Sequence, residues 1–274
     1  MAFFIIKASG EKEEFDLQKF RNSLQRAGAD AQLINDIIVR LVDMKPKSTQ
    51  EIHDFASEQL ALRNRSVATR YNVKRALFDF GPDGFPFERY VAALLHEQGY
   101  EVVVDQFVQG ACVVHEVDVI AIKDNKKYMG ECKFHNNAGI KTDIKVALYI
   151  QARFEDVQQG WKKNELDKNL FYQPWLFSNN KFTTDAIIYA KCVNMLITGW
   201  SYPAGSSLGE LIDKYGLHPI TALTSISRKQ KSEMIRDHII LARDVEKMRN
   251  NLAKYRLNKA EIDQLLKEVG GLHN

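Results

Sequence analysis

The sequence predicts an α/β (α+β) protein in three parts: a helical N-terminal domain with a small β-hairpin, a central mixed sheet flanked by helices, and a helical C-terminal tail. In the middle of the chain, short strand-like apolar runs alternate with helical patterns, whereas both ends are mostly helical in their periodicity. The segment GPDGFP at 81–86 places two prolines and two glycines in six residues, and it is the clearest break in the chain. We therefore expect domains at 1–82, 83–203 and 204–274.

The bulk composition is that of an ordinary soluble protein, with 274 residues of which 45% are apolar and 27% charged. A net charge of +3 permits nucleic-acid binding without requiring it. The three cysteines lie far apart with no CxxC pair, so neither a zinc ribbon nor a disulfide framework is indicated. No run approaches the roughly 18 apolar residues of a membrane span, and the first residues lack the basic start of a signal peptide. We therefore expect a cytoplasmic protein with no membrane partner.

Helix-start signals divide the first domain into a strand-like run and four helices. The run FFIIK precedes Asp16, which begins a helix with apolar residues at helical spacing. A second helix follows Asp30, and Ser48 caps a third. The stretch 59–78 predicts a fourth helix, with five cationic residues and no acidic one. Its charged face is either solvated, which is the usual case, or in contact with phosphate.

The central part begins with a helix over 87–98, followed by a strand from Tyr100 and then two strands that contain charged residues. A helix over 142–159 comes next. A strand, a helix and a strand follow, carried by PWLFS, KFTTDAIIYAKC and NMLITGW. This mixture is typical of a central sheet with helices packed on it.

The two charged strands lie in HEVDVIAIKDNKKYMGECKFH, residues 115 to 135. A two-residue turn at Asp124 and Asn125 places Asp118 directly opposite Glu131 when the pairs are counted back from the turn. Lys133 then points to the same side as Glu131. A four-residue loop would keep these charged residues on one face, whereas a three-residue loop would separate them.

Two carboxylates opposite each other repel unless a cation or a proton compensates. Mg²⁺ prefers carboxylate oxygens and usually takes only one or two of them from the protein. A neighbouring lysine such as Lys133 can orient or deprotonate a water molecule and offset charge at a phosphate. Glu88, at the edge of the apolar face of the preceding helix, is a natural third carboxylate. The alternative is an exposed hairpin with solvated cross-strand pairs.

The order of Glu88, Asp118 and then Glu131-Cys132-Lys133 across helix, strand and strand resembles the PD-(D/E)XK nucleases, specifically the Mrr-like restriction endonuclease branch, over about 84–202. The resemblance implies a restriction-endonuclease-like sheet, DNA as partner, and Mg²⁺ or Mn²⁺ as cofactor. It assigns the metal to Asp118 and Glu131, assistance of the attacking water to Lys133, and support of the metal to Glu88. His135, Lys141, Lys145, Gln151 and Arg153 are weaker candidates for contact with the DNA backbone, and His115 is expected to be structural.

The stretch IIKASGEKEEFDLQKF resembles the start of the ATP-cone, a small nucleotide-sensing domain of ribonucleotide reductases, over about residues 3 to 80. The resemblance implies that ATP or dATP binds as a regulatory ligand. Ala8 replaces the usual arginine, so one cationic contact of the family is absent. The alternative is a helical domain that binds DNA or a partner and has lost nucleotide binding. The positions that match the nucleotide pocket are Ile5, Lys7, Glu13, Asp16, Lys19, Thr49 and Lys74.

The C-terminal part is predicted to be helical, with Ser227 and Asn258 as N-caps. Its pattern loosely resembles a helix-hairpin-helix module, a reader of the DNA backbone, and a dimerisation or packing bundle is the alternative. The expected function is that of a Mg²⁺-dependent DNA endonuclease, a phosphodiester hydrolase regulated by ATP or dATP, acting in restriction of foreign DNA as a homo-oligomer. The other hypotheses are a nucleotide-responsive DNA-binding regulator with an inactive nuclease fold, and an RNase.

Overall fold

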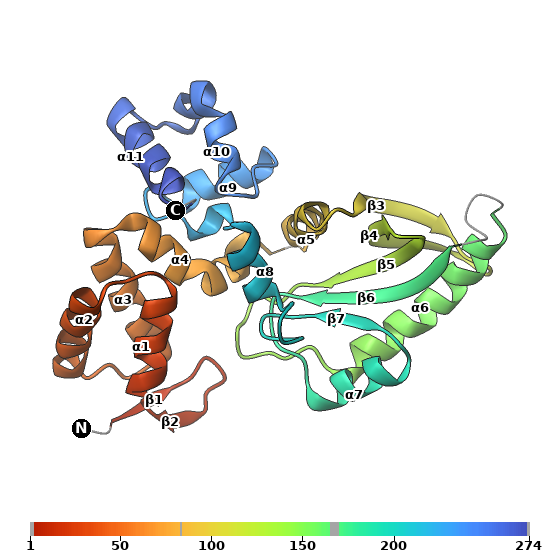
Figure 1. Ribbon diagram of the computed structural model, residues 1–274, viewed down its shortest axis with the longest axis horizontal. Helices are drawn as coiled ribbons and strands as arrows, with labels where there is room; N and C mark the ends of the chain where they lie inside the picture. The colour runs from red at the N-terminus through yellow and green to blue at the C-terminus, as the bar shows by residue number, and fades with distance from the viewer. Residues whose placement is uncertain (1–2, 83, 165–169, 273–274) are drawn as a thin grey trace. The chain divides into compact units, whose positions relative to one another are not determined.

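The computed structural model describes residues 3–82, 84–164 and 170–272, which form two compact units. The first unit contains residues 1–80, 137–139 and 216–274, and the second contains 81–136 and 140–215 (Figure 1). The chain therefore changes unit at the predicted break near residue 82. Since the C-terminal helices belong to the same unit as the N-terminal ones, their folding as a separate domain stays a prediction.

The first unit begins with a small antiparallel hairpin of β1 and β2, followed by four helices (Figure 1). The expected N-caps are confirmed: the side chains of Asp16, Asp30 and Ser48 each accept a hydrogen bond from a backbone N–H in the first turn. The helices bury one apolar core against the hairpin, to which Ile5, Leu24 and Leu41 contribute. The bounds are β1 Phe4–Ile6, β2 Lys12–Glu14, α1 Leu17–Arg26, α2 Ala31–Met44, α3 Thr49–Arg63, α4 Arg65–Ala76 and the 3-10 helix η1 Leu77–Phe80.

The C-terminal helices of this unit pack on α4. Ser227 and Asn258 cap two of them, each in a capping box, as the sequence predicts. They enclose a core of their own, and Leu252 and Leu265 are fully buried in it. The bounds are η2 Ile220–Ala222, α9 Arg228–Arg236, α10 Asp244–Lys247, η3 Arg249–Tyr255 and α11 Lys259–Gly270.

Buried polar groups join α4 to the C-terminal helices. Glu268 of α11 is 2% exposed, and its carboxylate accepts hydrogen bonds from the Thr69 hydroxyl at 2.6 Å and the Thr224 backbone N–H at 2.7 Å. Arg70 donates to the carbonyls of Ala27 at 2.9 Å and Gly271 at 3.0 Å. The basic face of α4 was expected to be solvated or bound to phosphate. At Arg70 it is instead occupied by backbone carbonyls.

The second unit is built on a five-stranded mixed sheet of order β3-β4-β5-β6-β7, which confirms the predicted α+β class. The first three strands are antiparallel, and β6 and β7 run parallel to β5. The bounds are α5 Phe85–Glu97, β3 Glu101–Gln109, β4 Val114–Lys123, β5 Lys126–Lys133, α6 Ile144–Lys162, β6 Phe171–Ser178, α7 Thr184–Cys192, β7 Leu196–Thr198 and α8 Leu208–Tyr215.

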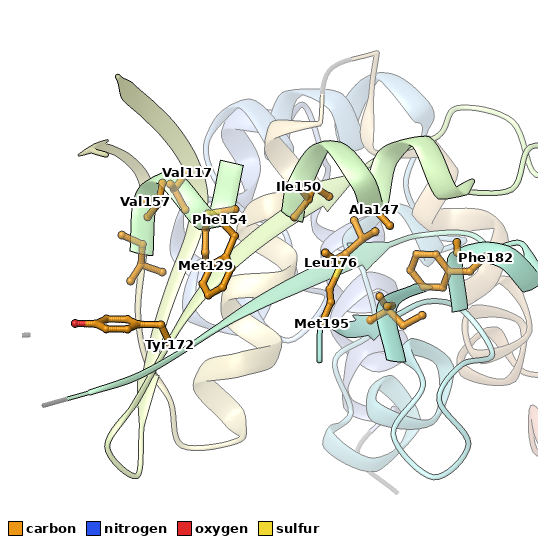
Figure 2. Close-up of a cluster of buried hydrophobic side chains, with 14 of the residues drawn as sticks. Val117, Met129, Ala147, Ile150, Phe154, Val157, Tyr172, Leu176, Phe182 and Met195 are labelled. Atoms are coloured by element: carbon orange, nitrogen blue, oxygen red, sulfur yellow. The ribbon is translucent and has the colours of Figure 1, made fainter. Parts of the chain in front are cut away.

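The long helix α6 lies along the sheet, and its apolar face forms the core of this unit (Figure 2). Ile150 and Phe154 of α6 pack toward Met129 of β5 and Leu176 of β6. This packing also brings Arg153 of α6 to Glu131 of β5 and Asp156 of α6 to His115 of β4. No helix within the described ranges is long and apolar enough to cross a membrane.

Candidate functional site: a carboxylate cluster and a nucleotide-binding hairpin

The turn between β4 and β5 has the two-residue form that the sequence predicts. Asp124 and Asn125 have φ values of 50° and 61°, the left-handed conformation that a type I′ turn requires at both central positions. The strands pair from Lys123↔Lys126 back to Val119↔Gly130. The two-residue turn is therefore confirmed, and counting one position beyond the last paired residues sets Asp118 opposite Glu131.

Hydrogen bonds and an ion pair hold the two carboxylates in place. One oxygen of Asp118 (Oδ2) accepts a hydrogen bond from the backbone N–H of Cys132 at 2.7 Å. One oxygen of Glu131 (Oε1) pairs with the guanidinium of Arg153 from α6. The other oxygen, Glu131 Oε2, is buried and has no hydrogen-bond partner within the described residues. An unpartnered buried carboxylate oxygen is costly, and a cation is one group that would compensate it.

Glu88, from the N-terminal turn of α5, belongs to the same electrostatic cluster. Burial, together with the charges of Asp118 and Asp105, raises the pKa of Glu88 to about 8. Its side chain is also hydrogen-bonded to that of Asp105. Since one carboxyl must carry a proton to donate this bond, the cluster holds a proton near neutral pH in place of a cation.

Asp105 is a member of the cluster that the sequence analysis missed. The register of β3 with β4 runs from Glu101↔Ile122 to Gln109↔Val114 and leaves Asp105 at the position opposite Asp118. Its φ of 55° lies in the left-handed region, which is unusual within a strand. In the sequence, Asp105 could be noticed only as a single carboxylate in the otherwise largely apolar run EVVVDQFV. The run does not predict its backbone conformation.

The pKa values of the strand carboxyl groups are raised as well. Burial is the largest cause for Glu131, followed by the charge of Asp118, and together they raise the pKa of Glu131 to about 7 although Arg153 and Lys133 oppose the shift. Burial also raises the pKa of Asp118, against the hydrogen bond from the Cys132 N–H. A raised pKa means that the charged form of the carboxyl group is disfavoured. The protein by itself therefore compensates the charges of Asp118 and Glu131 only poorly.

Lys133 is exposed at the end of β5, two residues beyond Glu131. His135, a weaker candidate for phosphate contact, lies instead in a structural network: its Nε2 is 2.8 Å from the Thr142 hydroxyl, and its backbone N–H donates to Asn179 at 2.9 Å. Burial and the charge of Lys133 lower the pKa of His135, so the ring is neutral at pH 7.

His115 has the structural role that was expected. Its Nε2 lies 2.8 Å from Oδ2 of Asp156 on α6. This hydrogen bond holds the pKa of Asp156 well below its usual range. The same carboxylate accepts a hydrogen bond from the backbone N–H of Cys112 at 2.8 Å, so it fixes the loop between β3 and β4.

The donor set of the cluster suits a hard divalent cation. No group of three histidine, cysteine, aspartate or glutamate residues within 3–82, 84–164 and 170–272 is arranged as a metal site. Mg²⁺, however, is usually held by only one or two carboxylates, with water or substrate phosphate completing its shell. Asp118 and Glu131 supply two carboxyl groups, the number that such an ion usually takes from a protein.

The hairpin of the first unit gathers several of the predicted nucleotide-binding residues. Ile5 is buried and pairs with Glu13 across the hairpin. The ammonium of Lys7 lies 2.6 Å from Glu13 and 3.1 Å from Glu11, and these carboxylates raise the pKa of Lys7. An isolated bridge between Ile6 and Ser48 brings β1 to the start of α3, where Thr49 is the first residue.

Asp16 and Lys19 lie at the N-terminus of α1, where the Asp16 carboxylate caps the helix by accepting from the Lys19 backbone N–H at 2.8 Å. Lys74 lies on a different element, in the last turn of α4. A pocket along the exposed side of α1, from its N-cap to its last turn, is lined by Asp16, Gln18, Lys19, Asn22, Gln25 and Arg26.

His53 is a second residue that the sequence analysis missed. It lies one turn after Thr49 on α3, and its ring stacks on Tyr71 at a centroid distance of 5.0 Å. Burial and the nearby Arg75 lower the pKa of His53 to about 4, and its Nε2 is buried with no hydrogen-bond partner among the residues the structure describes. The sequence indicates this proximity through the four-residue spacing of Thr49 and His53, which places both side chains on one face of the helix.

The hairpin, the four helices and their lysines define an ATP-cone. The ATP cone domain model matches residues 3–77 and confirms this assignment, and with it a nucleotide-binding domain. A second model, AF1548-like, C-terminal, matches residues 218–273.

The chain is also similar to a protein sequence and to a solved structure. The chain is 43% identical over 155 residues to an uncharacterized protein of Archaeoglobus fulgidus, covering 57% of this chain and 83% of the relative. A crystal structure of AF1548, described as a protein of unknown function, superposes with a TM-score of 0.57 at 38% identity, covering 69% of this chain and all of that chain. The chain therefore belongs to the AF1548-like family.

Proposed function

We propose that this protein is a Mg²⁺-dependent DNA endonuclease whose activity is regulated by ATP or dATP bound to the ATP-cone. The observation that carries the proposal is the electrostatic interaction of the Asp118 and Glu131 carboxyl groups, with an unpartnered buried oxygen on Glu131 and Lys133 at the end of the same strand. Glu88 and Asp105 are hydrogen-bonded to each other, and Glu88 interacts electrostatically with Asp118, so a bound cation would compensate the charge of the cluster in place of the proton. Such a cluster favours a divalent cation beside a phosphate.

The chemistry is the hydrolysis of a phosphodiester bond. The oxygen of a water molecule attacks phosphorus, one P–O bond breaks, and the leaving oxygen takes a proton to become a hydroxyl. Lys133 would orient the attacking water or offset charge on the phosphate. Asp118 and Glu131 would hold the ion, and Mg²⁺ when bound supplies Lewis-acid stabilisation of the phosphate charge. Arg153 keeps Glu131 in position from the α6 side.

Regulation by nucleotide requires unequal binding of ATP or dATP to active and inactive states. Lys7 and Thr49 approach the same end of the ATP-cone, at the start of α3, where backbone N–H groups favour a phosphate. The state to which the nucleotide binds more tightly would differ from the other state in its cleavage activity or in its homo-oligomeric assembly.

The test is cleavage of labelled single-stranded DNA, duplex DNA and RNA by the full chain, with Mg²⁺ or with EDTA, and with and without each nucleotide. We expect Mg²⁺-dependent DNA cleavage that Glu131→Gln abolishes and that Glu101→Gln, on exposed β3, leaves unchanged. Equal cleavage by wild type and Glu131→Gln would identify a contaminant. Absence of cleavage under every nucleotide condition would favour a DNA-binding regulator, and cleavage of RNA alone would make the protein an RNase.

A further inference from the structure

Two large side chains are exposed on the elements that carry the carboxylate cluster. Tyr149 on α6 is 62% exposed, and Phe107 on β3 is 75% exposed. Single exposed apolar residues are normal on protein surfaces. These two, however, are related to the cluster through one residue, Arg153.

Arg153 relates both aromatic residues to the carboxylate pair, Tyr149 through its ring and Phe107 through the backbone of the neighbouring strand. Its guanidinium carbon lies 5.4 Å from the centre of the Tyr149 ring, and one of its nitrogens pairs with Glu131. Another nitrogen donates to the backbone carbonyl of Glu116, and Glu116 is the cross-strand partner of Phe107. The Tyr149 ring therefore lies beside the guanidinium that contacts the proposed site of hydrolysis, and Phe107 lies on β3 opposite the Glu116 backbone that the same guanidinium contacts.

The charge around the rings favours a nucleic-acid strand over a protein. Lys145 is exposed one helical turn before Tyr149, and Lys133 is exposed at the end of β5, so cationic groups are available for phosphates. Aromatic rings beside cationic side chains are the usual platform for unpaired bases, which stack on them irrespective of sequence. In an intact duplex the base faces are covered by their neighbours, so exposed rings have nothing to stack on.

We infer that the substrate of this site presents unpaired bases next to the scissile phosphate, as in a single strand or a flap, and that Tyr149 and Phe107 stack on those bases. The inference rests on the proposed function for the position of the scissile phosphate. The binding of the strand, however, can be measured without cleavage.

The experiment measures binding of a fluorescent single strand and of the matching duplex to full-length Glu131→Gln protein in EDTA, by fluorescence anisotropy. We expect tighter binding of the single strand, and a weakening of about 5-fold to 100-fold for Tyr149→Ala and for Phe107→Ala. Tyr149→Phe, which keeps the ring, should bind like the parent. Ile188→Ala is the matched control, because Ile188 is 61% exposed on α7.

Equal affinity for duplex and single strand, with no effect of Tyr149→Ala, would overturn the inference. A change in oligomeric state with unchanged strand binding would overturn it too, since the rings would then form an interface between copies. Duplex cleavage as fast as single-strand cleavage, unchanged by Tyr149→Ala, would refute the stacking and leave the hydrolysis intact. Ring-dependent strand binding without Mg²⁺-dependent cleavage would refute the hydrolysis and leave the strand-binding surface.

Discussion

Arg153 on α6 forms an ion pair with Glu131 on β5, and the two side chains are only 12% and 16% exposed. The same guanidinium donates to the backbone carbonyl of Glu116 on β4, so it joins the helix to both charged strands. The pair engages one oxygen of Glu131 and leaves the other buried and unpartnered in the described part of the chain. Arg153 therefore fixes the Glu131 carboxylate through one of its two oxygens.

Replacing Arg153 with methionine should lower stability more in EDTA than in Mg²⁺. The substitution leaves Glu131 largely buried without its partner, at a cost of about 2 kcal/mol in the free energy of unfolding. A divalent cation would restore part of the compensating charge. Thermal unfolding of wild type and Arg153→Met, each with EDTA and with Mg²⁺, measures this difference. An equal loss of stability in both conditions would contradict a cation site at Glu131.

The stability of the metal-free protein should fall as the pH rises from about 5 to about 8. In the folded protein the pKa of Glu131 is about 7 and that of Glu88 about 8, whereas both groups have an unperturbed value of 4.5. As the pH rises, the unfolded chain therefore loses these protons at a lower pH than the folded protein does. The stabilisation, complete below pH 4.5, is lost as the pH passes through the folded values.

Urea unfolding of wild type and Glu131→Gln across this pH range isolates the contribution of one carboxyl group. We expect a difference on the order of 2 kcal/mol between the two ends of the range, and its suppression by Mg²⁺. Parallel pH profiles for the two proteins would show that the pKa of Glu131 is not raised.

Nucleotide binding should depend on Lys7 and Lys19. Loss of one ammonium that contacts a triphosphate weakens binding by about tenfold or more, because a charge-assisted hydrogen bond is lost. Calorimetry with ATP and dATP on Lys7→Ala and Lys19→Ala tests this expectation. Lys12→Ala is the control, since Lys12 is an exposed lysine of the same hairpin. If both variants bound nucleotide with unchanged affinity, the assignment of the nucleotide pocket to the hairpin and α1 would be wrong.

Glu268 should be essential for the attachment of the C-terminal helices to α4. An amide replaces one carboxylate oxygen with an NH2 group, which then faces the N–H donor of either Thr224 or Ser225, so Glu268→Gln should cost about 3 kcal/mol in the free energy of unfolding. Glu246→Gln, on the exposed surface of α10, should cost less than about 0.5 kcal/mol. Denaturant unfolding compares the two variants, and similar stabilities would contradict the role given to the buried carboxylate.

The sequence predicts those parts of the site that depend on local rules. The Asp-Asn turn fixes the register of β4 with β5, and that register alone brings Asp118 and Glu131 together. Helix caps such as Asp16 and Asn258 follow from hydrogen bonds within one turn, so they too could be read from the sequence.

The remaining parts depend on contacts between distant segments. Asp105 joins the cluster through a left-handed backbone conformation in an apolar strand, which no local pattern indicates. Arg70 looked like a solvated or phosphate-binding side chain until the carbonyl of Gly271, about two hundred positions away, was found to accept its hydrogen bond. Such partners are set by tertiary packing, and charge patterns along one helix cannot identify them.

The most direct test of the central claim is the rate of Mg²⁺-dependent DNA cleavage by Lys133→Ala, measured beside wild type and Lys126→Ala. Both lysines are exposed at the ends of β5, but Lys133 is two residues from Glu131, whereas Lys126 is at the opposite end of the strand. We predict that Lys133→Ala lowers the rate by at least about 100-fold, the usual contribution of a residue that assists the attacking water, and that Lys126→Ala cleaves like wild type. Equal cleavage rates for all three proteins would contradict the assignment of hydrolysis to this site.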